Sequence, residues 1–87
     1  MSVPTSGYEP QTCVYNVQGS KSGASLGIDI SVWLDPNASN NDDLLSYGEA
    51  AAYAIADAAS ADSYVVNIVQ RTFAGGTRNE QLPYPPS

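Results

Sequence analysis

The sequence contains no histidine and has few cationic side chains. Lys21, Arg71 and Arg78 are outnumbered by nine acidic residues, which gives the 87-residue chain a formal net charge of −6. A surface that binds phosphates needs clustered positive charge, so these scattered cations argue against nucleic acid as a partner. The same deficit argues against docking on anionic membranes. Without an imidazole, the chain also lacks the ordinary general base for a serine or cysteine nucleophile.

Cysteine is equally scarce, because Cys13 is the only one in the chain. No disulfide can therefore close within the chain. Cys13 alternates with Tyr15 and Val17 on an expected core face, which favours a buried small hydrophobe over a reactive thiol. The first residues show no classical secretion signal, and no apolar run reaches membrane-spanning length. We expect a soluble protein, cytoplasmic or virion-associated, that needs no cofactor.

Alternating apolar residues predict three strands, over residues 12–18, 25–34 and 64–73. The second is the most regular, because one of its faces carries five branched apolar side chains: Leu26, Ile28, Ile30, Val32 and Leu34. The third is partly apolar on both faces, as expected of a central strand. The small, polar residues 19–24 predict a hairpin loop longer than the tight two-residue type.

A helix is predicted over residues 42–60, where the apolar period changes to 3.6. Gly48 costs about 1 kcal/mol of helix propensity against alanine, so we interpret it as a point of close approach to a strand. Ser39 or Asn40 is expected to supply an acceptor for the first-turn amides. The stripe expected to face the sheet comprises Leu44, Leu45, Gly48, Ala51, Ala52, Ile55, Ala58 and Ala59.

These elements predict an α+β fold, a two-layer sandwich with the order β-β-α-β. The first two strands form an antiparallel hairpin, and the strand–helix–strand unit should make a right-handed crossover that leaves its two strands parallel. The sheet is therefore expected to be three-stranded and mixed, with one helix on one face. Whether the third strand lies beside the first or the second does not follow from the pattern. We expect one domain over residues 12–76, an extended arm over 1–11 and a proline-rich tail over 77–87.

One helix can cover only one face of this sheet. The other face is expected to carry five large apolar residues: Val14, Trp33, Val65, Val69 and Phe73. Several such residues on a small sheet indicate a binding surface, so we predict a homo-oligomer or the docking of another protein there. The alternative is that one terminus folds back over this face. The leading hypothesis is a non-enzymatic structural or binding module, in a style that suits a virion or phage accessory protein, although no motif supports that assignment.

Two further hypotheses remain. In the first, the chain is a monomeric acidic inhibitor that binds a basic site on a partner protein through its outer helix face: Asp42, Glu49, Tyr53 and Asp57. In the second, Asp35, Asn37 and Ser39 form a calcium-stabilised loop that resembles part of an EF-hand. That pattern fails at two positions, since Asn40 replaces the turn glycine and Ser46 the bidentate glutamate. We therefore expect no metal and no enzymatic activity.

Overall fold

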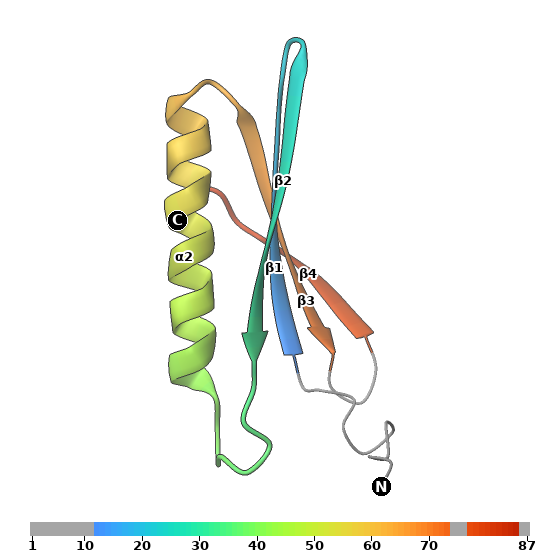
Figure 1. Cartoon of the computed structure of the whole chain (residues 1–87), viewed down its shortest axis with the longest axis vertical. Helices are drawn as coiled ribbons and strands as arrows, with labels where there is room; N and C mark the ends of the chain where they lie inside the picture. Colours follow the sequence, from blue (N-terminus) through green and yellow to red (C-terminus); the bar gives the residue numbers. More distant parts are fainter. Residues whose placement is uncertain (1–11, 74–76, 86–87) are drawn as a thin grey trace, which may run out of the picture.

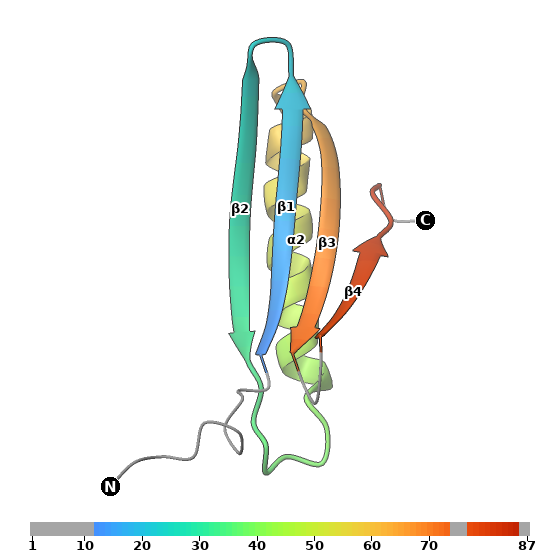
Figure 2. The same cartoon turned by 90° about the vertical axis from the view of Figure 1, so that its right-hand side faces the viewer.

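The computed structural model describes residues 12–73 and 77–85, which form one helix and four strands in two layers (Figure 1). The strand order is β2-β1-β3-β4, and every neighbouring pair is antiparallel. Figure 2 shows the sheet from the side opposite the helix, with α2 behind the strands. The elements are β1 (Thr12–Lys21), β2 (Ala24–Trp33), α2 (Asp42–Ala61), β3 (Val65–Phe73) and β4 (Thr77–Leu82).

The predicted two-layer α+β arrangement is confirmed, whereas the three-stranded mixed sheet is wrong. β3 lies beside β1, so β2 and β3 run in the same direction with β1 between them and no parallel pair forms. The fourth strand, β4, comes from the segment predicted to be a proline-rich tail. Its polar sequence gave no apolar alternation to detect. The predicted arm, residues 1–11, lies outside the described residues.

The β1–β2 hairpin is tighter than predicted. Lys21 pairs with Ala24, so the loop consists of Ser22 and Gly23 alone. Gly23 has a φ of +78°, a conformation that glycine adopts without steric cost. The small residues before the loop therefore extend β1 rather than form a longer connection.

The core lies between α2 and one face of the sheet. Cys13, Tyr15 and Val17 of β1 are fully buried on this face, as predicted, and Ile68 of β3 is buried opposite Val17. The helix contributes mainly alanines: Ala52, Ala56 and Ala59. Small side chains bring the helix near the strands but bury little apolar area each, so the core is thin.

α2 lies close to the sheet at Gly48, which confirms the interpretation of this glycine as a point of close approach. A Cβ atom at Gly48 would lie 2.6 Å from both Tyr15 Cε1 and Val32 Cγ2. The Tyr15 hydroxyl donates a hydrogen bond of 3.1 Å to the carbonyl oxygen of Leu45, one turn earlier in the helix. Burial raises the pKa of Tyr15 above its ordinary value. Tyr15 thus sets how close the helix lies to β1, through its ring, and where the helix lies along β1, through its hydroxyl.

The helix is rotated relative to its predicted stripe. Leu44, Ala51 and Ala58 were expected to face the sheet but are exposed, whereas Ala56 is fully buried and Tyr53 is half-buried. On that side of the helix, residues after β4 pack against Tyr53, so the side chain has a partner there. The helical pattern alone carries no information about this contact.

The C-terminus of α2 is closed by a Schellman motif. Ser63 N–H donates to the Ser60 carbonyl and Tyr64 N–H to the Ala59 carbonyl, both at 3.0 Å. Lys21 Nζ donates to the carbonyl oxygen of Asp62 at 3.1 Å, which ties the end of β1 to the helix terminus. Ser63 has a φ of +71°, in the left-handed region that glycine usually occupies at this position.

Ser63→Gly is therefore expected to raise the free energy of unfolding by about 1 kcal/mol, because it removes the Cβ strained by the left-handed backbone. Urea denaturation followed by circular dichroism measures the change. The matched control is Ser60→Gly, inside the exposed last turn of α2, which should lower the free energy of unfolding by about 0.5 kcal/mol. A loss of stability in Ser63→Gly would contradict the cap assignment.

Candidate protein-interaction surface

The helix-free face of the sheet carries all five residues predicted to form an interface. Trp33, Thr12 and Phe73 lie in one row across β2, β1 and β3, and Val14 follows in the next row. Trp33 is 69% exposed, while Val14, Val69 and Phe73 are half-buried. These four apolar side chains lie in the first three rows of this face, counted from the start of β1, and alternate there with polar residues such as Thr12 and Arg71. We call them the Trp33 patch: Val14, Trp33, Val69 and Phe73.

Val65 does not belong to this patch, although it is equally exposed at 69%. It pairs with Ser20, two rows beyond Val69, and the pair Gln18–Asn67 lies between. The predicted apolar surface is therefore divided by a polar band. Its end near Val65 contains a shallow groove of about 410 Å³ lined by Asn16, Gln18, Gly19, Ser20, Ser25, Leu26, Gly27, Val65 and Asn67.

Hydrogen bonds between side chains hold the polar band together. Asn16 Nδ2 donates to Asp29 Oδ1 at 2.6 Å, which links β1 to β2. Gln81 Nε2 donates to Asn67 Oδ1 at 3.4 Å, which links β4 to β3. Within the described residues, Asn16 Oδ1 is buried and accepts no hydrogen bond. Two side-chain hydrogen bonds thus link neighbouring strands next to the Trp33 patch, and one buried acceptor there has no partner within the described residues.

On the other side of the sheet, the segment after β4 crosses to the helix (Figure 1). Tyr53 Oη donates to the carbonyl oxygen of Pro83 at 2.8 Å, and Tyr84 Oη donates to Asp57 Oδ1 at 2.7 Å. The two tyrosine rings stack with centroids 6.2 Å apart. The hydrogen bond to Asp57 raises the pKa of Tyr84, and desolvation raises that of Tyr53. We call residues 83–85 the C-terminal segment.

The C-terminal segment covers part of the outer helix face that the inhibitor hypothesis predicts to bind a partner. Tyr53 and Asp57 are engaged by the C-terminal segment, whereas Asp42 and Glu49 are exposed. A partner that used all four residues would have to displace Tyr84 first. No local pattern predicts this contact, because it joins residues about thirty positions apart.

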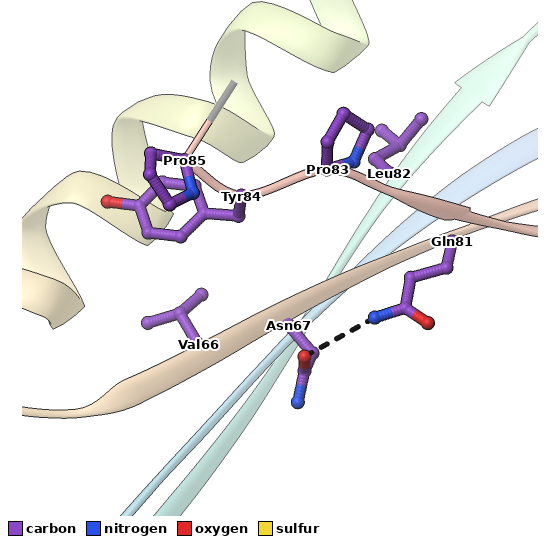
Figure 3. Close-up of a pocket in the computed structure, with 7 residues that line it drawn as sticks. All are labelled: Val66, Asn67, Gln81, Leu82, Pro83, Tyr84 and Pro85. Carbon is purple, nitrogen blue, oxygen red and sulfur yellow. Dashed lines mark hydrogen bonds between the residues drawn. The ribbon is translucent and has the colours of Figure 1, made fainter. Parts of the chain in front are cut away.

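A second groove, of about 500 Å³, lies where β4 ends (Figure 3). Leu82 pairs with Ile68, after which Pro83 has no N–H with which to continue the ladder. The chain turns from β3 towards α2 and leaves a groove lined by Val66, Asn67, Gln81, Leu82, Pro83, Tyr84 and Pro85. Its lining contains no charged side chain, and its one hydroxyl, that of Tyr84, is bonded to Asp57.

The loop before α2 uses its polar side chains to bind its own backbone. Asp35 Oδ1 accepts from Asn37 N–H, and Asn41 Oδ1 accepts from Asp35 N–H, both at 2.9 Å. The N-cap residue is Asn41, which makes no side-chain cap hydrogen bond, so neither Ser39 nor Asn40 is the N-cap. Asn40 Oδ1 nevertheless accepts the first amide of the helix, that of Asp42, at 3.2 Å. The three calcium candidates lie in this exposed loop. Across residues 12–73 and 77–85, no cluster of three or more His, Cys, Asp or Glu residues is placed to hold a metal ion.

Cys13 occupies the core position predicted for it. Its Sγ atom accepts a hydrogen bond from Gln70 Nε2 at 3.3 Å and lies 3.9 Å from Thr72 Oγ1. The thiol is fully buried, so solvent does not reach it. In this environment the cysteine serves as a small core side chain with polar neighbours on β3.

The described part of the chain contains no helix with the length and apolar character needed to cross a membrane. No family model matches the chain, and no curated protein or solved structure matches it either. What the chain does has to be inferred from its own surfaces.

Proposed function

We propose that the chain is a non-enzymatic structural or binding module that self-associates through its helix-free sheet face, with the Trp33 patch at the centre of the contact. The observation that carries this proposal is the exposure of Trp33, 69%, beside Phe73 and Val14 on a face that no described element covers. Large aromatic side chains surrounded by smaller apolar ones are typical of the energetic centre of protein interfaces.

The charges on this face favour a second copy as the partner. Arg71 lies in the row of Val14, and Asp29 lies one row further along, on the opposite side of β1. In a face-to-face contact about a two-fold axis, Arg71 of each copy can approach Asp29 of the other. The patch itself contains no acidic side chain, so the net charge of −6 is not concentrated where the copies would meet.

The thin core gives a second physical reason for association. Trp33 leaves most of its area in water, and burying it would contribute about 3 kcal/mol per copy before the entropic cost of association. A sheet that is covered on one face mainly by alanines gains more from such burial than a sheet with a large core of its own.

Trp33→Asp and Val69→Asp are each expected to weaken self-association by at least tenfold, because both place a charge in the apolar centre. Sedimentation velocity across a concentration series measures the mass relative to the 9.1 kDa monomer. The matched control is Val65→Asp, which is as exposed as Trp33 and on the same face but outside the patch. It should change the dissociation constant less than threefold. The proposal fails if Trp33→Asp and Val69→Asp both leave the mass distribution unchanged.

A further inference from the structure

β2 forms one edge of the sheet, and within the described residues its ten positions pair with β1 alone. The opposite edge, β4, has features that discourage pairing with a strand of another chain. It is short, carries Arg78 and Glu80 and is followed by Pro83. β2 is longer, at ten residues, contains no proline, lysine or arginine, and has Asp29 as its one charged residue. Its outer row of backbone N–H and C=O groups is a template for another strand.

The flank of α2 nearest to β2 is apolar and uncharged. Tyr53 and Asp57 mark the flank that contacts the C-terminal segment, and the contact between Gly48 and Val32 places the helix over β2. At about 100° per residue, the flank opposite Tyr53 carries the three helix residues that were predicted to face the sheet but are exposed, Leu44, Ala51 and Ala58. With Ile28, which is 39% exposed, they form what we call the β2 flank: Ile28, Leu44, Ala51 and Ala58.

Charge is kept away from this flank. The acidic side chains Asp42, Glu49 and Asp57 lie on the side of α2 that faces the C-terminal segment, by the same helical geometry. Asp29 is the one charged residue of β2, and its side chain lies on the helix-free face, bonded to Asn16. By the same geometry Asp43 points away from the sheet, and Asp62, which follows the last turn of α2, pairs with Lys21 at 3.3 Å. Two copies of a strongly acidic chain can therefore approach along β2 with most of their helix carboxylates directed away from the contact.

We propose that the free edge of β2 pairs antiparallel with β2 of a second copy about a two-fold axis through Ile28. This register places apolar side chains opposite one another on the helix side, Leu26 against Ile30 and Ala24 against Val32. On the other side, Asp29 lies opposite Gly27 of the second copy. The product is a continuous eight-stranded sheet with both helices on one face and the two β2 flanks buried between them.

The neighbouring registers are less favourable. An axis through Asp29 would set the two Asp29 carboxylates directly opposite one another, which destabilises a strand pair. An axis through Ile30 would pair only residues 27–33 of β2 and leave the hairpin end of the strand open. Pairing about Ile28 engages residues 24–32. This self-complementarity singles out a second copy of the chain as the occupant of the edge.

The edge contact is distinct from the face contact of the proposed function. The Trp33 patch lies on the helix-free face near one end of β2, whereas the β2 flank lies on the helix side and is centred on Ile28. A chain with two independent self-complementary surfaces assembles beyond a dimer. The inference therefore extends the proposed function from association to multivalent assembly.

Cysteine cross-linking tests the register directly. Two residues opposite one another in an antiparallel pair have Cβ atoms roughly 4.5–5.5 Å apart, close enough for a disulfide after a small adjustment. Ile28→Cys is therefore expected to form a covalent dimer under mild oxidation, read on a non-reducing gel. Ile30→Cys is the matched control, because its counterpart would lie four residues away, about 13 Å. The native Cys13 is fully buried and does not interfere.

A cross-link in Ile28→Cys alone supports the proposed register. Equal cross-linking at both positions, or none at Ile28→Cys, overturns it. Far-UV circular dichroism of both variants establishes that each is folded, which is expected because neither side chain belongs to the fully buried core.

The solution mass separates this inference from the proposed function. We expect wild type to exceed a dimer, Ile28→Lys and Trp33→Asp each to give a dimer, and the double variant to be a monomer. If Ile28→Lys leaves the mass distribution unchanged while Trp33→Asp lowers it, the edge contact is wrong and the proposed function stands. If only Ile28→Lys lowers the mass, the edge contact stands and the face contact is wrong. A wild-type protein that stays monomeric at millimolar concentration overturns both.

Discussion

Replacing Tyr15 with alanine is expected to lower the free energy of unfolding by about 3–5 kcal/mol, as removal of a buried aromatic side chain does. Tyr15 is the largest fully buried side chain, and its ring fills the space left by Gly48. Its hydroxyl also bonds the Leu45 carbonyl of the helix. The fully buried side chains that α2 contributes to this core, Ala52 and Ala56, are small, and the larger Leu45 and Ile55 are only half-buried. We therefore expect the cavity left by Tyr15→Ala to close only in part.

A domain of this length has about 4–13 kcal/mol of stability in all, so Tyr15→Ala should leave a substantial unfolded population. Urea denaturation and the loss of near-UV circular dichroism measure the effect. Tyr15→Phe is the matched control, since it keeps the ring and removes only the hydroxyl, at an expected cost of about 1 kcal/mol. If Tyr15→Ala costs no more than Tyr15→Phe, the ring does not hold the two layers together.

Because of the Tyr15 hydroxyl, the difference in free energy of unfolding between wild type and Tyr15→Phe is expected to depend on pH. Burial raises the pKa of Tyr15 in the folded state above the value of 10.0 for an unperturbed tyrosine. The folded state therefore binds this proton more tightly than the unfolded state, and the resulting stability is present below about pH 10 and lost as the pH rises above it. Tyr15→Phe removes this contribution, so its free energy of unfolding should fall less steeply with pH than that of wild type.

Gly48→Ala is expected to lower the free energy of unfolding by about 1–3 kcal/mol, although alanine favours a helix by about 1 kcal/mol over glycine. The added Cβ would lie 2.6 Å from carbon atoms of both Tyr15 and Val32, a distance that van der Waals repulsion forbids. The helix would have to move away from β1 and β2 together. The same move would lengthen the bond between Tyr15 and the Leu45 carbonyl.

Thermal unfolding of Gly48→Ala against wild type measures this effect. Gly27→Ala is the matched control, because nothing lies within 4 Å of a Cβ at that position. It should be neutral or slightly stabilising. A gain in melting temperature in Gly48→Ala would show that helix propensity outweighs the contact and that the layers are less tightly fitted than the distances indicate.

The parts of the fold that follow from local periods were predicted from the sequence. Alternation placed Cys13, Tyr15 and Val17 on the core face, and the cost of glycine in a helix identified the approach at Gly48. The parts that depend on distant contacts were not predictable in this way. The position of β3 beside β1 depends on how the crossover packs, and β4 has a polar sequence whose strand conformation comes from pairing with β3.

The candidate site shows the same division. The sequence placed Val14, Trp33, Val65, Val69 and Phe73 on one face, but the separation of Val65 from the others depends on its register with Ser20. The exposure of Leu44, Ala51 and Ala58 followed from a helix rotation that the stacking of Tyr84 on Tyr53 accompanies. No local pattern encodes that contact, so the β2 flank could be found only in the folded structure.

The crossing of the C-terminal segment to the helix has a practical consequence for anyone who attaches this chain to a solid support. The described structure ends at Pro85 on the helix side of the sheet, where Tyr84 is anchored to Asp57 (Figure 1). A tether placed there would orient the molecule with Trp33 towards the bulk solution. A tether at a cysteine introduced near Trp33 would reverse that orientation. Comparing the amount of partner bound by the two immobilised forms would show which face of the molecule the partner contacts.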